Sequence, residues 1–143
     1  MRITTKVRYG VRFMLFLAKE HGKGPISMRE IATREEISEK YLGLIALSLK
    51  NAGLVNSTKG SRGGYVLAKP PEGITLCDVM RALDGDIRLV DCVRDASACS
   101  RSVSCEARGV WDTVGNKIAE TLDSITLEGL IRAGRGRRGP LEA

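Results

Sequence analysis

The 143-residue chain lacks any long apolar run, and its N-terminus lacks the features of a secretion signal. No segment approaches the roughly 20 consecutive apolar residues that a membrane-spanning helix requires. Residues 1–6 contain two basic side chains but no apolar segment followed by a small-residue cleavage site, so no signal peptide is predicted. We therefore expect a cytoplasmic protein that has no membrane as a partner.

Histidine is almost absent, since His21 is the only one in the chain. No cluster of acid and base side chains of the kind that catalyses proton transfer accompanies it. Residues 59–64 are glycine-rich and basic, but they lack the Gly-Lys-Ser/Thr ending and the following helix of a nucleotide-binding phosphate loop. We therefore predict that the chain is not an enzyme.

The chain has only four cysteines, and three of them lie in one polar segment. Six residues separate Cys92 from Cys99, and five separate Cys99 from Cys105, in a run without the apolar periodicity of a helix or strand. In a reducing compartment a loop of this kind indicates metal or redox chemistry, because thiolates are ligands of soft metals and clusters. Cysteines also pack in protein interiors or pair by chance, and Cys77, outside the loop, is expected to serve packing rather than metal binding.

Acidic side chains are scarce in the first half of the chain. Residues 1–69 carry thirteen Lys and Arg and five Asp and Glu, a net charge of +8, whereas residues 70–143 carry ten and twelve, a net charge of −2. A basic region of this kind is typical of proteins that bind the phosphate backbone of DNA, although an acidic protein or an anionic lipid would also fit.

Thr4 or Thr5 can cap a first helix, whose apolar residues recur at helical spacing over a wide arc. A helix of this kind is buried on more than one side, as happens when it packs in its own domain and also meets a partner. Residues 21–25 contain two glycines and a proline, which end the helix with glycine as its C-cap.

The next segment predicts two helices joined by a tight turn. Ser27 and Glu30 form a capping box that opens a short helix. A polar connection over residues 33–37 precedes Ser38, which caps a longer helix that ends at Gly53. This order is typical of a helix-turn-helix, whose second helix enters the major groove of DNA, although helical hairpins also occur in proteins that do not bind DNA.

Two strand-like runs, residues 54–58 and 65–68, follow this second helix. With the basic glycine-rich residues 59–64 between them, they predict a β-hairpin, the wing of a winged helix-turn-helix. Glycines allow the tip to approach a groove closely, while Lys59 and Arg62 can meet phosphates or enter the minor groove.

Beyond the cysteines, apolar residues at four-residue steps predict a long amphipathic helix, and no remaining segment is large enough to cover it. We expect this helix to form a homodimer, since two copies can bury the same stripe against each other. A short capped helix over residues 125–131 then repeats the Ile-Thr-Leu sequence of residues 74–76. The expected dimerisation stripe is Val110, Val114, Ile118 and Leu122.

The predicted fold class is therefore mostly α with a small β-hairpin wing, that is, a winged helix-turn-helix plus a long C-terminal dimerisation helix. We expect a DNA-binding domain over residues 1–69, ending at a Pro-Pro boundary, and a cysteine sensor loop with the dimerisation helix over residues 70–131. Residues 132–143 are expected to form a basic, disordered tail.

Short motifs along the chain carry a family resemblance: residues 1–6, Tyr41-Leu42, Ala52-Gly53-Leu54-Val55, Gly63-Gly64-Tyr65, Ile74-Thr75-Leu76 and the three loop cysteines before Trp111. Individually short but jointly specific, they resemble the winged-helix regulators that include IscR, NsrR and CymR. The resemblance implies a dimeric bacterial transcription regulator that binds a double-stranded DNA operator. Many members hold an iron–sulfur cluster on the cysteine loop and change operator affinity with cluster state.

By this resemblance, Cys92, Cys99 and Cys105 match the ligands of an iron–sulfur cluster, taken as the two-iron two-sulfur type. Arg108 stands where IscR-like members have a histidine ligand, and Arg8 stands where NsrR-like members have an acidic one. Arginine cannot act as a ligand because it stays protonated. The fourth ligand is therefore open among His21, Glu106, Asp91, Asp95, a partner-chain group and a small molecule.

The resemblance also assigns DNA contacts to both parts of the winged helix. Gly43 stands where IscR-like members carry an acid that shapes operator choice, so the operator sequence is not transferred. Ser38 can equally act only as the helix cap. The matching residues are Ser38, Lys40 and Tyr41 on the second helix and Ser57, Lys59, Gly60 and Arg62 on the wing.

We therefore predict a dimeric DNA-binding regulator that senses iron–sulfur cluster, redox or nitric oxide status through the cysteine loop. Two cluster-free alternatives stay open. One is a thiol switch that uses a Cys99–Cys105 disulfide, and the other is a regulator that, as in the CymR branch, senses cysteine supply through a partner enzyme.

Overall fold

A computed structural model describes residues 2–136, which form helices and one two-stranded antiparallel hairpin. The predicted mostly α architecture with a β-hairpin is confirmed. The elements, in chain order, are α1 (Thr5–Lys19), α2 (Met28–Glu35), α3 (Glu39–Asn51), β1 (Val55–Thr58), β2 (Gly64–Leu67), η1 (Pro71–Gly73), α4 (Leu76–Asp84), α5 (Asp91–Arg94), η2 (Ala96–Ala98), α6 (Glu106–Asp123) and α7 (Leu127–Gly136).

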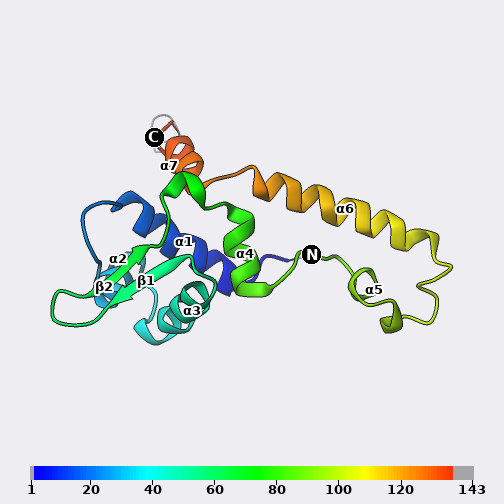
Figure 1. The fold of residues 1–143 in the computed structure, drawn as a ribbon, viewed down its shortest axis with the longest axis horizontal. Coiled ribbons are helices and arrows are strands. Elements are labelled where there is room, and N and C mark those ends of the chain that lie inside the picture. The colour runs from blue at the N-terminus through cyan, green and yellow to red at the C-terminus, as the bar shows by residue number, and fades with distance from the viewer. Residues whose placement is uncertain (1, 137–143) are drawn as a thin grey trace.

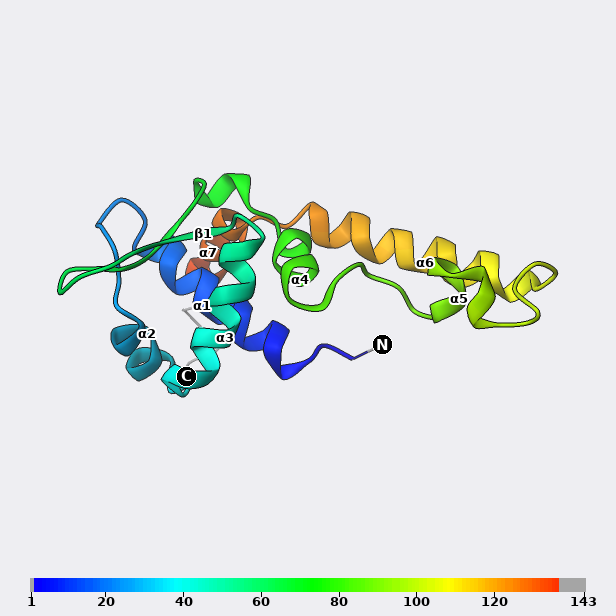
Figure 2. The same ribbon diagram turned by 60° about the horizontal axis from the view of Figure 1, so that its bottom comes forward.

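The molecule consists of a compact body and a projecting arm (Figure 1). Helices α1 to α4, the hairpin and α7 form the body, whereas α6 extends away from it and α5 lies near the outer end of α6 (Figures 1 and 2). The hairpin and the segment that carries the cysteines therefore lie at opposite ends of the molecule.

Helix α1 lies at the centre of the body, and side chains such as Phe13 and Met14 are fully buried. It packs against α2, α3, α4 and α7, so the expected burial on more than one side is confirmed. Gly10 lies so close to Leu83 of α4 that a Cβ at this position would overlap the leucine side chain. The two helices can approach this closely because residue 10 has no side chain.

Three predicted helix caps are present in the structure. The hydroxyls of Ser27 and Ser38 accept the backbone N–H groups of Glu30 and Tyr41, each at 3.1 Å. Thr4 caps α1 in the same way by accepting the N–H of Val7 at 3.2 Å. Each contact satisfies a backbone donor that has no partner inside its own helix, which fixes where the helix starts.

Two predicted helix ends are wrong. Residues 33–35 belong to α2 instead of to a polar connection, because Glu36 takes the left-handed conformation that ends the helix, with φ of 56°. Helix α1 ends one turn before the glycines, and Glu20 is its C-cap. Part of the expected tail is also helical, since residues 132–136 continue α7, while the rest of the tail lies outside the described residues.

The hairpin is extended by the chain that precedes α2. Its strands pair antiparallel from Val55 opposite Leu67 to Thr58 opposite Gly64. The Ile26 N–H donates to the Tyr65 carbonyl at 3.0 Å, and the Tyr65 N–H donates to the Ile26 carbonyl at 2.8 Å. These bonds fasten the base of the hairpin to the helix-turn-helix.

Residues before and after position 70 contribute to one hydrophobic core. Val79 and Leu83 of α4, together with Leu127 and Ile131 of α7, are buried in the same core as α1. The chain leaves the body after α4 and returns to it at α7 (Figure 1). The two Ile-Thr-Leu sequences, residues 74–76 and 125–127, lie at the starts of α4 and α7.

The two sequences pair with each other. The Leu76 N–H donates to the Ile125 carbonyl at 2.8 Å, and the Leu127 N–H donates to the Ile74 carbonyl at 3.0 Å. We call this pairing the clasp. It joins the end of the arm to the start of α4, which connects α6 mechanically with the body.

Candidate nucleic-acid interface and cysteine loop

The second helix of the helix-turn-helix, α3, is buried on one face and open on the other. Lys40, which is predicted to contact DNA, is exposed in the first turn of α3. Tyr41 is half-buried, and its ring meets the ring of Tyr9 edge-on, with centroids 5.8 Å apart. The Arg12 guanidinium lies 5.4 Å from the centre of the Tyr9 ring. This packing holds the start of α3 against α1.

Ser38 serves as the N-cap of α3 through its bond to the Tyr41 N–H. Of its two expected roles, the structure accounts for the capping role. A contact between its exposed side chain and DNA stays a prediction.

The predicted wing residues Ser57, Lys59, Gly60 and Arg62 are all exposed on the hairpin. The tip turns tightly because Gly60 has φ of +110°, a conformation that favours glycine. Within residues 2–136, neither Lys59 nor Arg62 forms an ion pair with a carboxylate. Their charges are therefore available to phosphates.

Lys50 connects the two parts of this surface, and the sequence prediction missed it. Its Nζ donates to the Ser57 hydroxyl at 2.7 Å, which ties the last turn of α3 to β1. In the sequence, the only indication of this contact was the position of Lys50 in the last turn of α3. Lys50 therefore carries positive charge to the junction of α3 and the wing.

The cysteine segment contains two short helical turns, although no regular structure was expected there. Cys92 lies in α5 and is partly buried, whereas Cys99 follows η2 and Cys105 precedes α6, and both are exposed. All three are free thiols. Ser102 is buried and donates its hydroxyl to the Ala96 carbonyl, which folds the segment back on itself.

Arg108 fixes this segment to the first turns of α6. Its Nε–H donates to the Cys92 carbonyl at 2.8 Å. Together with Cys105, Ser102 and Asp112 it lines a polar hollow of about 340 Å³. Arg108, at the position where IscR-like members are expected to have a histidine ligand, therefore supports the backbone of a cysteine.

The structure does not bring the expected cluster ligands together. Within residues 2–136, no three His, Cys, Asp or Glu side chains lie close enough to hold a metal ion. The Oδ1 atom of Asp91 lies 3.9 Å from the Nε atom of Arg88. Asp95 accepts hydrogen bonds from Ser97, and these bonds lower the pKa of its carboxyl group. His21 follows α1 in the body, whereas the cysteines lie on the arm (Figure 1).

Cys77 lies in α4, fully buried in the body. Burial raises the pKa of its thiol, so the thiol keeps its proton and is a poor ligand and nucleophile. The expected packing role agrees with this environment.

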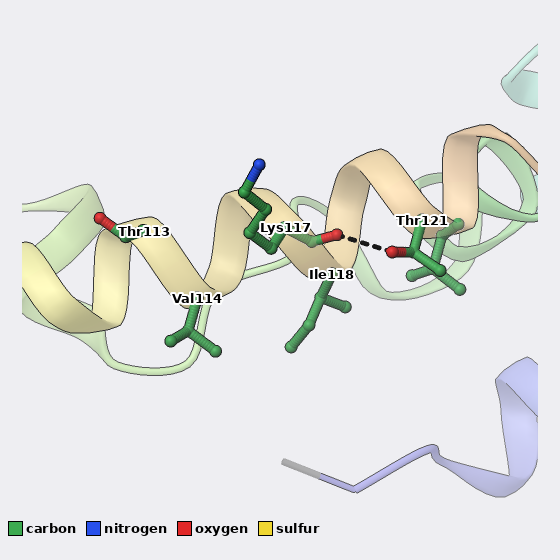
Figure 3. Close-up of a pocket in the computed structure, with 6 residues that line it drawn as sticks. Thr113, Val114, Lys117, Ile118 and Thr121 are labelled. Atoms are coloured by element: carbon green, nitrogen blue, oxygen red, sulfur yellow. Dashed lines mark hydrogen bonds between the residues drawn. The ribbon is translucent and has the colours of Figure 1, made fainter.

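Helix α6 carries an uncovered apolar face. Of its residues only Gly115 is buried, whereas Val110 is 54% exposed and Val114 is 40% exposed. Ile118 and Leu122 are half-buried and, with Val114, line a shallow groove of about 360 Å³ along the helix (Figure 3). The predicted dimerisation stripe therefore lies along one side of the arm.

No helix within residues 2–136 has the length and apolar character needed to cross a bilayer.

Comparisons with known proteins identify the same class. The model of the Rrf2 family, described as iron-dependent transcriptional regulators, matches residues 3–133. CymR of Bacillus subtilis is 42% identical over 130 residues, which are 91% of this chain and 89% of that protein. IscR of Photorhabdus laumondii is 34% identical over 131 residues, which are 92% of this chain and 79% of that protein.

Solved structures agree with these sequence relatives. The structure of B. subtilis CymR, described as its global cysteine regulator, has a TM-score of 0.75 and covers 91% of this chain and 95% of its own. The structure of T. potens IscR is 34% identical, has a TM-score of 0.77 and covers 100% of this chain and 97% of its own. The winged helix-turn-helix expected from the sequence is thereby confirmed.

Proposed function

Because the chain belongs to the Rrf2 family of transcriptional regulators and is no enzyme, we propose that it binds an operator as a homodimer and senses through its cysteine loop. The observation that carries this proposal is the position of Cys105, which directly precedes the exposed amphipathic helix α6. A chemical change at the loop would act on the helix that sets the spacing of two DNA-binding bodies. A regulator of this kind acts on bacterial DNA, so its proposed location is the cytoplasm.

Double-stranded DNA is the proposed ligand of the face formed by α3 and the wing. Phosphate contacts come from Lys59 and Arg62, which are exposed and unpaired with any described carboxylate. The net charge of +8 on residues 1–69 supports the same ligand, since phosphate neutralisation supplies most of the non-specific affinity for DNA. Ser38, Lys40, Tyr41, Ser57 and Gly60 complete the proposed contact set.

The homodimer is proposed to form along α6. A helix with Val110, Val114 and Trp111 exposed gains free energy by burying them against a second copy, and a two-fold dimer presents the same residues from both sides. Two bodies related in this way would read two half-sites of an operator, with a separation set by the arms.

A continuous set of contacts links the loop to the DNA-binding face. Arg108 holds the Cys92 carbonyl to α6, and at the other end of α6 Asp123 accepts a hydrogen bond from the Thr75 hydroxyl at 3.2 Å. Thr75 caps α4, which packs on α1 through Gly10, and α1 contacts α3 through the Tyr9–Tyr41 ring pair. Two arrangements of the loop would therefore bias two arrangements of the winged helix.

The first proposed loop chemistry is an iron–sulfur cluster, of the two-iron two-sulfur type, held by Cys92, Cys99 and Cys105. Three thiolates suit such a cluster, which would supply a redox-sensitive and displaceable centre when bound. The fit of the donor set is incomplete, because Arg108 cannot be the fourth ligand and the described side chains offer no group of three donors. The protein's own residues contribute the loop, its attachment to α6 and the path to the body.

The second candidate is a cluster-free regulator. Its supporting observations are the exposed free thiols of Cys99 and Cys105 and the role of Arg108 as a backbone support. The 42% identity to CymR also supports it, since that protein is described as a global cysteine regulator. In this form the loop would respond through a Cys99–Cys105 disulfide or through a partner enzyme.

The decisive experiment is to purify the protein without oxygen and record its visible absorbance, with iron and sulfide analysis. Absorbance with matching iron and sulfide, lost in Cys92→Ala but kept in Cys77→Ala, is expected for the cluster. A colourless, iron-free protein after attempted reconstitution would contradict it. Operator binding measured before and after peroxide, with a Cys99→Ser control, then separates the thiol switch from regulation by a partner enzyme.

A further inference from the structure

Two leucines project from the open face of α3. Leu44 is 58% exposed and Leu47 is 55% exposed, while Leu42 and Ile45 of the same helix are fully buried. Residues three apart are neighbours on a helix surface, so the two exposed side chains form one apolar strip. The body core is already closed beneath them, which means that the strip is not needed for folding.

The surroundings of this strip restrict what can cover it. Lys40 lies one turn before Leu44, and Lys50 lies three residues after Leu47, so positive charge borders the strip at both ends. Gly43, next to Leu44, has no neighbouring atom within 4 Å of where its Cβ would be, so the helix is open to close approach there. A second copy of the same face would place lysines against lysines.

The major groove of B-DNA has the complementary chemistry. Phosphates line its two edges, and the C5-methyl group of thymine is the apolar group that it presents to a protein. A strip of leucines between lysines matches a groove of methyl groups between phosphates. Polar readout of the bases requires hydrogen-bonding side chains, which Leu44 and Leu47 do not have.

We propose that Leu44 and Leu47 recognise thymine methyl groups in the major groove, so that these two residues determine part of the operator sequence. The inference rests on the proposed function, because it assigns specificity within the proposed DNA-binding face. It predicts that each operator half-site contains thymines opposite the middle of α3.

The test begins with selection of duplexes from a random pool by the wild-type full-length protein. The enriched duplex is then prepared a second time with 2′-deoxyuridine in place of each half-site thymine in turn, which removes only the methyl group. We expect one or two positions at which the wild type loses about fourfold in affinity, the value for burying one methylene-sized group.

The variant Leu44→Ala/Leu47→Ala should bind the thymine duplex more weakly than the wild type and should no longer distinguish thymine from uracil. Folding is checked by the thermal midpoint, which is expected to be unchanged because both side chains are exposed. Val103→Ala is the matched control, since Val103 is 92% exposed on the cysteine loop and should leave the discrimination intact.

The results distinguish a failure of the leucine assignment from a failure of the proposed DNA-binding function. Equal affinity of the wild type for thymine and uracil duplexes at every position would overturn the leucine assignment while leaving DNA binding in place. Enrichment of no duplex would overturn the DNA-binding function and the assignment with it. Discrimination that persists in the double variant would show that other residues read the methyl groups.

Discussion

Thr75 and Thr126 pair with each other as an isolated antiparallel bridge at the point where the arm returns to the body. Each also caps a helix, since the Thr75 hydroxyl accepts the Asp78 N–H at 3.1 Å and the Thr126 hydroxyl accepts the Gly129 N–H at 3.0 Å. The two paired threonines therefore also cap α4 and α7. Both Ile-Thr-Leu sequences thus have the same two roles, because each starts a helix and each pairs with the other.

Replacing Thr75 with alanine should destabilise the protein by about 1 kcal/mol, the usual cost of losing a threonine N-cap. The variant also loses the hydrogen bond from Thr75 to Asp123, which holds the end of α6. Urea denaturation measures the change. Thr33→Ala is the control, because Thr33 is exposed and its hydroxyl bonds to the Arg29 carbonyl within α2, so its effect should stay within about 0.5 kcal/mol. Equal effects would show that the Thr75 hydroxyl, through its cap and its bond to Asp123, adds no stability.

Replacing Arg62 with alanine should weaken binding to all DNA sequences to a similar extent. Loss of one phosphate contact reduces the slope of log K against log salt concentration by roughly one. Fluorescence anisotropy over a series of salt concentrations gives this slope. Arg101→Ala, an exposed arginine on the cysteine loop, should leave it unchanged. A slope for Arg62→Ala equal to that of the wild type would remove Arg62 from the interface.

Replacing Val114 with glutamate should convert the proposed dimer into a monomer. The change places a charge in the apolar groove of α6, where a partner helix would have to desolvate it, and an unpaired buried charge costs several kcal/mol. Light scattering after size-exclusion chromatography measures the mass. Asn116→Glu is the matched control, since Asn116 is exposed on α6 but does not line the groove. A dimer that survives Val114→Glu would place the interface elsewhere.

Cys77 should make the protein less stable at alkaline pH. Burial raises the pKa of its thiol above the ordinary value of 9.0, so the folded state keeps a proton that the unfolded chain loses. The unfolded state then binds fewer protons, and the free energy of unfolding falls as pH rises above about 9. Denaturation of wild type and Cys77→Val between pH 7 and about 10 measures this difference. A parallel pH dependence of the two proteins would exclude the contribution of Cys77.

The burial of Cys77 also lowers the reactivity of its thiol toward disulfide reagents. An aromatic disulfide reagent should modify Cys92, Cys99 and Cys105 in the folded protein, since Cys99 and Cys105 are exposed and Cys92 is partly so. Cys77 should react only after unfolding, because its protonated, buried thiol is a weak nucleophile. Mass spectrometry of the labelled peptides identifies which thiols have reacted.

By itself the sequence determined the local features. Helix starts at Thr4, Ser27 and Ser38 depend on a side chain and a backbone N–H three residues away, so they can be recognised in any context. Helical spacing likewise predicted the apolar stripe of α6, and glycines between two strand-like runs predicted the hairpin. The family also followed from short motifs that the comparisons confirm.

Only the tertiary structure decided which distant segments meet. Residues 74–76 and 125–127 are paired, and α4 and α7 share the core of α1. The role of Arg108 as a support for Cys92, and the exposure of Leu44 and Leu47, were equally beyond the sequence. A pattern of apolar residues shows that a helix has a buried face, but the neighbours of each face depend on how all the segments pack together.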